Sequence, residues 1–220
     1  AVLNCCSILK ERIDPIAKDM PGASWVEIIS KCYSVGVDLS EKFMVHGQNS
    51  HAFKYNIYGT TCTEAEIDVL TGETEILRTD ILFDCGRSIN PEIDIGQVEG
   101  AFIMGLGYWL TEQAIYDSTT GLQLNTGTWD YHPPFSKDIP IDFRVSLLKD
   151  APNPLGVLRS KAVGEPPQCM SCSCLFAVQD AIYHAREEIE KDKDYFALDG
   201  PATVEATQLK CLVDTTQFVF

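Results

Sequence analysis

Gln97 lies in a segment whose residue types suit the binding of an anion. It follows Gly96 within Ile93–Gly100, near the start of a helix that the pattern predicts from about Gly96 to Gln113. The N-terminus of a helix presents unbonded N–H groups and a positive dipole end, and a carboxamide can donate or accept hydrogen bonds there. A helix start with a solvated glutamine has the same pattern, and the spacing alone favours this simpler interpretation.

Glu165 has the residue type and the surroundings of a general base. It precedes Pro166 and Pro167 at the expected start of the longest helix. The helix dipole favours an ionised carboxylate and burial a neutral one, so a carboxylate held between these tendencies could accept a proton. Gly164 would let another group approach the backbone closely. The prolines favour an extended backbone at Glu165, which would aim its side chain off the helix. From the residues alone, an acidic first-turn residue that complements the dipole remains the commoner explanation.

Cysteines and histidines offer a weaker case for metal or hydrolytic chemistry. Cys169, Cys172 and Cys174 lack the second pair, or the suitably spaced histidines, that a tetrahedral zinc site needs, so we predict buried thiols and no metal ligands. The odd total of nine cysteines, scattered through apolar segments, favours free thiols in a reducing cytosol. No GxSxG motif is present, and no HExxH spacing relates His46, His51, His132 and His184.

The charge balance excludes several classes of partner. Lys and Arg number 17 against 32 Asp and Glu, a net charge of −15, and such a chain would repel a nucleic-acid backbone or an anionic membrane surface. The uncharged runs Gly100–Thr111 and Pro166–Gln179 are shorter than the roughly 18 apolar residues of a membrane span, so we predict buried helices there. The first ten residues show no basic leader or cleavage site, and we expect a cytoplasmic location.

Hydrophobic periodicity predicts helices at both ends of the chain and strands between them. Val2, Cys6, Leu9 and Ile13 recur at helical spacing, and Ser24 opens a second helix with a capping-box pattern that should stop near Gly36. Beyond it, apolar residues alternate with acidic ones in 63–69, and 75–84 returns as a partner strand. Together with 53–58, these two strands predict an antiparallel meander of three strands.

The second half of the chain predicts mainly helices. We expect a turn at 117–121, a strand at 143–148, a long helix from Pro166 to about Glu190 and a short helix opened by Pro201 and Thr203. The expected fold class is therefore α+β, with antiparallel strands and helices packed against them.

Four segments in this order resemble the molybdenum hydroxylases, the aldehyde oxidase and xanthine dehydrogenase family: DCGRSINPEIDIGQVEGAFIMGLGYWLTE, FRVSLL, SKAVGEPP and GPATVEAT. The similarity is collinear from about Val2 to the end, and the GQxEG and KAxGEP pair is specific at this separation. It implies that residues 1–220 are the C-terminal portion of a molybdopterin cofactor-binding domain. The iron–sulfur and FAD domains of such proteins are absent from this sequence, as is the plant-type cluster motif C-x4-C-x2-C.

The resemblance assigns roles that displace the simpler interpretations above. Gln97 would hydrogen bond near the molybdenum ligands, Ala162, Val163 and Gly164 would contact the cofactor through their backbones, and Glu165 would be the catalytic base. It implies molybdopterin in this region, with FAD and two 2Fe-2S clusters in the rest of a homodimeric enzyme. The reaction would be oxidative hydroxylation of a small molecule with water as the oxygen source.

The substrate class is less sharply indicated. The segments MGLGYWLTE, NTGTWDYHPPFSKDIP and GVLRSKAVGEPP look closer to insect-type aldehyde oxidases, which favours oxidation of aldehydes to carboxylic acids. The alternatives are a xanthine dehydrogenase, which hydroxylates a purine or related N-heterocycle, and a non-catalytic segment that serves in packing or dimerisation.

Overall fold

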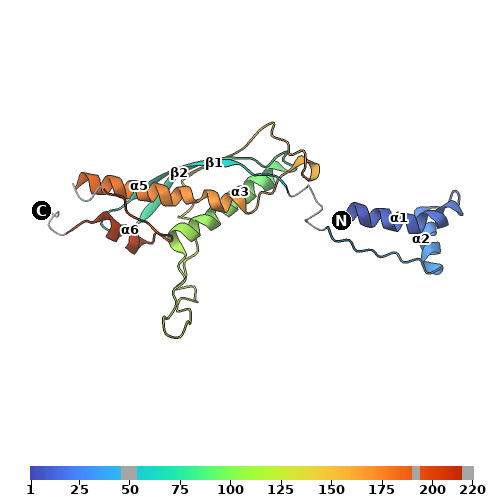
Figure 1. The fold of residues 1–220 in the computed structure, drawn as a ribbon, viewed down its shortest axis with the longest axis horizontal. Helices are drawn as coiled ribbons and strands as arrows, with labels where there is room; N and C mark the ends of the chain where they lie inside the picture. The colour runs from blue at the N-terminus through green and yellow to red at the C-terminus, as the bar shows by residue number, and fades with distance from the viewer. Residues whose placement is uncertain (46–53, 190–193, 215–220) are drawn as a thin grey trace. The chain divides into compact units, whose positions relative to one another are not determined.

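The computed structural model describes residues 1–45, 54–189 and 194–214, which belong to two compact units, Ala1–Lys54 and Tyr55–Phe220 (Figure 1). No helix among these described residues is long and apolar enough to cross a membrane.

The first unit contains α1 (Val2–Lys18) and α2 (Trp25–Ser34). Ser24 caps α2 as predicted: its hydroxyl accepts a hydrogen bond from the Glu27 N–H, and the Glu27 carboxylate accepts one from the Ser24 N–H at 2.7 Å. Gly36, with φ of +79°, follows the end of α2, where the left-handed conformation stops the helix. The predicted start and stop of this helix are both confirmed.

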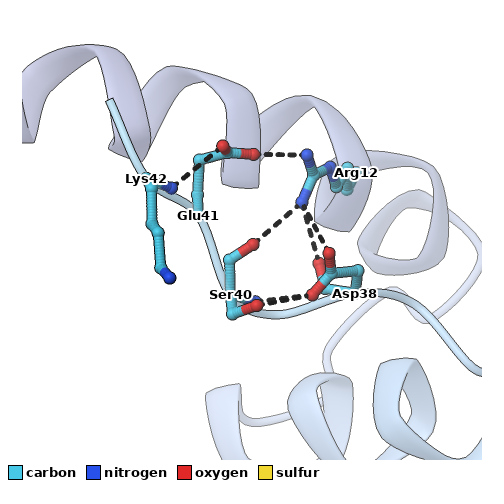
Figure 2. A network of polar contacts seen from close by, with 5 residues as sticks. All are labelled: Arg12, Asp38, Ser40, Glu41 and Lys42. Atoms are coloured by element: carbon cyan, nitrogen blue, oxygen red, sulfur yellow. Dashed lines mark hydrogen bonds and ion pairs between the residues drawn. The ribbon is translucent and has the colours of Figure 1, made fainter. Parts of the chain in front are cut away.

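Arg12 of α1 holds the extended segment that follows α2 (Figure 2). Its guanidinium donates to the carbonyls of Asp38 and Ser40, at 3.3 and 3.1 Å, and pairs with the Glu41 carboxylate. Asp38 also accepts hydrogen bonds from the backbone and hydroxyl of Ser40, and these lower the pKa of its carboxyl. The segment is therefore held to α1 by polar contacts.

The second unit is built on a three-stranded sheet of order β1–β2–β3, formed by Gly59–Ile67, Thr74–Phe83 and Asp142–Leu147. β1 and β2 are antiparallel, with a register shift between Glu64 and Ala65, whereas β2 and β3 are parallel. Parallel strands need a long crossover, and the chain supplies one through α3 (Pro91–Leu106).

This parallel pair corrects part of the predicted topology, although the α+β class is confirmed. We expected 53–58 to be the third strand of an antiparallel meander, but residues 54–58 form no strand and Phe53 lies outside the described residues. The strand predicted at 143–148 takes that place, as β3. Residues 54–58 run beside the end of β2 instead: the Tyr58 carbonyl accepts a hydrogen bond from the Asp84 N–H at 2.9 Å.

One face of the sheet is covered by helices and the other is open. α5 (Cys172–Glu188) packs on β1 and runs along the sheet in Figure 1, and α3 packs on β3. Thr79, Ile81 and Phe83 alternate on the covered face of β2 and are buried, while Leu82 points to the other face and is 40% exposed. The buried cluster also includes Val98, Phe102 and Leu106 of α3 and Leu175, Val178 and Ile182 of α5.

Two helix boundaries differ from the predictions. α3 begins at Pro91, capped by Asn90, and continues through a π-helical turn, η3 (Gly107–Thr111). The helix predicted from Pro166 is interrupted at Ser171 into α4 (Pro166–Met170) and α5, because the Ser171 hydroxyl bonds to the Gln168 carbonyl at 2.6 Å. η4 (Val157–Arg159) precedes α4, and the predicted last helix is α6 (Val204–Cys211), capped by Thr203.

Gly105 explains why α3 tolerates glycine within a helix. A Cβ at this position would lie 2.5 Å from the Gln168 carbonyl oxygen and would also collide with the Ser171 hydroxyl. Only glycine therefore allows α3 and α4 to cross this closely. Gly105 therefore packs closely against another backbone, whereas a Cβ at Gly100 would meet nothing within 4 Å.

Candidate catalytic and cofactor-binding site

The two motif segments, far apart in the sequence, lie side by side in the second unit. Gly86 and Ser160 form an antiparallel bridge, the Lys161 N–H donates to the Cys85 carbonyl at 2.8 Å, and the Arg87 N–H donates to the Arg159 carbonyl at 2.8 Å. Gly86 has φ of +65°, and a Cβ there would lie 2.6 Å from the Arg159 carbonyl oxygen. Glycine at this position thus lets the two backbones meet.

A buried ion pair spans the same junction. The Lys161 ammonium contacts the Asp84 carboxylate across 77 positions of sequence, and the two side chains are only 10% and 4% exposed. Asp84 also accepts the Gly86 N–H at 2.9 Å, and Lys161 lies 5.3 Å from the centre of the Tyr58 ring. The sequence alone indicates no role for Asp84 or Lys161, because no local pattern relates residues this far apart.

Gln97 lies in the second turn of α3, so the prediction that it stands at the helix N-terminus is wrong. Asn90 is the N-cap, and its side chain accepts from the Glu92 N–H at 3.2 Å. The Asn90-Pro91 dipeptide supplies the N-cap and the first residue of the helix. Gln97 is therefore exposed on a formed helix, and it does not lie beside the free N–H groups at the helix start.

Gly164 brings the second motif against Gln97. A Cβ at Gly164 would lie 3.2 Å from the Gln97 Oε1, tighter than ordinary van der Waals contact, so the absence of a side chain leaves room for the carboxamide. Glu165 follows as the N-cap of α4, and its exposed side chain makes no capping hydrogen bond. Its φ and ψ of −105° and −35° are helical rather than extended, contrary to the expectation from the following proline.

Ala162 and Val163 are placed differently from Gly164. The Ala162 N–H donates to the Tyr55 hydroxyl at 3.0 Å and so has a protein partner, whereas the Val163 side chain belongs to the buried cluster. A cavity of about 370 Å³ beside this junction is lined by Arg87, Ser88, Ile89, Leu158 and Arg159, so Gln97 and Glu165 lie outside it.

The apolar residues near the motifs differ in burial. Phe102 is fully buried, and its ring centre lies 5.4 Å from that of Phe143 with the two rings tilted. Met104 and Tyr108 are 65% and 63% exposed, and they border a cavity of about 430 Å³ together with Trp109.

The cysteines divide by environment. All nine are free thiols, and Cys174 is fully buried, which raises the pKa of its thiol to about 12. Burial also raises the pKa of Cys85. Cys6, Cys62 and Cys169 are exposed, so the prediction of buried thiols is wrong at these positions. Among the described residues, no three His, Cys, Asp or Glu side chains gather closely enough to hold a metal ion.

The arrangement around Gly164 suits a hydrogen-bonding organic cofactor. Within the part of the chain that the structure describes, the side chains of Gln97 and Glu165 are exposed and bond to no other protein group. The carboxamide beside Gly164 and the carboxylate of the residue that follows Gly164 are therefore both exposed. These groups can hydrogen bond to polar atoms of a ligand, and the carboxylate can accept a proton from it.

Comparison with known proteins identifies the family of this chain. Residues 1–140 match the model of the molybdopterin cofactor-binding domain family. The chain is 41% identical over 223 residues to xanthine dehydrogenase/oxidase of Mus musculus, with 96% of this chain covered, and 38% identical over 228 residues to aldehyde oxidase 4 of the same species. The chain spans only 17% of the length of each of these relatives.

Solved structures of similar fold belong to the same group of enzymes. Quinoline 2-oxidoreductase from Pseudomonas putida 86 matches with a TM-score of 0.53 and 30% identity, over 67% of this chain and 17% of that chain. CO dehydrogenase from Oligotropha carboxidovorans, at 24% identity, shares the fold with a TM-score of 0.56 over 66% of this chain and 17% of that chain. The chain therefore belongs to the molybdopterin cofactor-binding domain family of the molybdenum hydroxylases.

Proposed function

We propose that this chain forms one wall of the cofactor site of a molybdenum hydroxylase that oxidises aldehydes to carboxylic acids with water as the oxygen source. In this proposal, residues 1–220 are the C-terminal portion of the molybdopterin cofactor-binding domain of a longer polypeptide. The observation that carries it is the proximity of Gly164 to the Gln97 carboxamide, whose Oε1 would lie 3.2 Å from a Cβ at Gly164, with the exposed Glu165 carboxylate next in the chain.

Each residue has a distinct role. Gln97 donates a hydrogen bond from its carboxamide to the cofactor, and Gly164 admits the cofactor close to the backbone. Glu165 accepts a proton at a carboxylate oxygen, which requires that it is ionised before the reaction. Ala162 and Val163 act through the backbone of the same segment, where the Tyr55 hydroxyl already holds the Ala162 N–H and restrains its position.

The cofactor, when bound, supplies the oxidation chemistry and accepts the two electrons that leave the substrate. FAD and two 2Fe-2S clusters, carried by parts of the polypeptide outside residues 1–220, complete the enzyme, which we propose is a cytoplasmic homodimer. The 220-residue chain alone is expected to be inactive, because exposed apolar residues such as Met104 and Tyr108 would lack partners.

A purine is the second candidate substrate. The identity to xanthine dehydrogenase/oxidase, 41%, exceeds the 38% identity to aldehyde oxidase 4, whereas the segments from Met104 to Glu112 and from Asn125 to Pro140 favour the aldehyde oxidases. The ratio of kcat/KM for benzaldehyde and xanthine in the full-length enzyme separates the two. A clear preference for xanthine would overturn the aldehyde assignment and leave the proposed residue roles intact.

Glu165→Gln tests the catalytic role most directly. The substitution keeps size and hydrogen-bonding capacity but cannot take the proton, and general-base assistance contributes about 10²–10⁴-fold. We expect the rate of enzyme reduction by substrate to fall at least about a hundredfold across pH 6 to 10, with molybdenum content unchanged. Glu66→Gln, an exposed position on β1, is the matched control and should be fully active.

Gln97→Ala separates tuning from catalysis. One neutral hydrogen bond contributes about 0.5–1.5 kcal/mol, so the rate should fall by about tenfold or less. A near-normal reduction rate with an unchanged pH profile in Glu165→Gln would show that the base lies elsewhere. A complete loss in Gln97→Ala would contradict the proposed division of roles.

A further inference from the structure

The segments that carry Gln97 and Glu165 are both anchored at one point. Asp84 ends the strand that leads into the loop before α3, and Lys161 directly precedes the residues that lead to Glu165. Their ion pair lies where the two segments meet, next to the Gly86–Ser160 bridge. Any change in the relative position of the two segments must therefore move one charge away from the other.

The remaining contacts at this junction define the register only weakly. Two backbone hydrogen bonds join residues 85–87 to 159–161, both of 2.8 Å. A ladder this short, without alternating apolar residues, can slip in register. The Asp84 carboxylate is held to its own segment by the hydrogen bond from the Gly86 N–H, so a slip between the two segments would separate it from Lys161.

The burial of the ion pair makes such a slip costly. The two side chains are 10% and 4% exposed, so a displaced charge would remain buried without a partner. Buried ion pairs are best known for specifying a register rather than for adding net stability. The surrounding aromatic ring of Tyr58, 5.3 Å from the Lys161 ammonium, restrains the lysine further.

We propose that the Asp84–Lys161 ion pair is a positioning element that fixes Glu165 relative to Gln97. This inference rests on the proposed function of those two residues. Gly164 lies directly beside Gln97, since a Cβ added at Gly164 would be 3.2 Å from the Gln97 Oε1, so a displacement of the segment that contains Gly164 would also move Glu165 relative to the carboxamide. A misplacement of about 1 Å can lower a catalysed rate by about a hundredfold.

The experiment uses Lys161→Met, which removes the charge and keeps the chain length, in the full-length enzyme. Hydrogen–deuterium exchange of the peptide that covers residues 159–165 should become faster, and kcat per bound molybdenum should fall about a hundredfold with little change in KM. Lys161→Arg keeps the charge and should recover most of the rate. Arg144→Met, at the exposed Arg144–Asp142 pair of β3, is the matched control and should change neither measurement.

Several outcomes would overturn the inference. Unchanged exchange in residues 159–165 of Lys161→Met would mean that the pair does not hold the segment. Faster exchange with unchanged kcat would mean that the pair contributes stability alone, and equal losses in the Met and Arg variants would exclude a role for the charge. If Lys161→Met does not fold, Asp84→Asn/Lys161→Met removes the unpaired charge, and the same two measurements decide.

The exchange measurement also separates this inference from the proposed function. Full activity in Glu165→Gln would reject Glu165 as the base. Faster exchange at residues 159–165 in Lys161→Met would still show that the ion pair holds the segment. Conversely, an inactive Glu165→Gln together with unchanged exchange in Lys161→Met would reject the positioning role alone.

Discussion

In each unit a cationic side chain holds a segment in place, but the two cations differ in their exposure to water. In the first unit, Arg12 contacts two carbonyls and the Glu41 carboxylate, and its side chain remains 35% exposed (Figure 2). In the second, Lys161 has one carboxylate partner, Asp84, and is 10% exposed. Removal of Arg12 leaves polar groups that water can reach, whereas removal of Lys161 leaves a buried carboxylate without a partner.

The difference extends to the apolar residues of each unit. Among the described residues of the first unit, 1–45, only Ile13 and Cys32 are buried, while Leu3 and Trp25 are 82% and 65% exposed. The second unit encloses a cluster that draws on its sheet, α3 and α5. Polar contacts and helix caps thus hold the first unit, and hydrophobic burial holds the second, so the same type of substitution should have unequal effects in them.

The largest expected effect is the loss of an aromatic ring from the second unit. Phe102→Ala should lower the free energy of opening of α3 by about 3–5 kcal/mol, because the fully buried ring leaves a cavity. Exchange of the α3 amides in the full-length enzyme measures this, with Glu92→Ala, at an exposed polar position of the same helix, as the control. Equal effects at the two positions would contradict a core built around Phe102.

A smaller effect is expected at the half-buried cation of the first unit. Arg12→Met should lower the free energy of opening of residues 38–42 by about 1 kcal/mol, since a pair that water partly reaches contributes less than a fully buried one. Faster exchange in that peptide is the measurement, and Lys10→Met, at the exposed Lys10–Asp14 pair of 4.0 Å, is the control. An effect in Arg12→Met as large as that in Lys161→Met would break the comparison between the two units.

The smallest effect is a pH dependence of the α2 cap. Hydrogen bonds from the Ser24 backbone and hydroxyl lower the pKa of Glu27 below its ordinary value of 4.5. The cap therefore contributes stability that is present above this value and is lost as pH falls through the lower pKa of the folded state. Amide exchange in the first turn of α2, corrected for the intrinsic effect of pH, should accelerate over that range. The same acceleration in Glu27→Gln, whose side chain does not titrate, would contradict this assignment.

Features set by neighbours in the sequence were predictable from the sequence. The capping box of Ser24 and Glu27, the turn at 117–121 and the Thr203 cap depend on contacts within a few residues, and all are present. The motif pair GQVEG and KAVGEP identified the family for a similar reason, because it can be read without knowing how the chain folds. The roles of Gln97 and Glu165 remain predictions of that resemblance.

Tertiary structure decided which distant segments meet. The alternation in 143–148 predicts a strand, but only the crossover through α3 makes it the parallel neighbour of β2. Likewise, no local pattern relates Asp84 to Lys161 or Gln97 to Gly164, because these contacts form only when the β2 end and the segment before α4 are brought together. The sequence by itself determined the residues that could do chemistry, and long-range packing determined their geometry, since local interactions carry no information about partners so far along the chain.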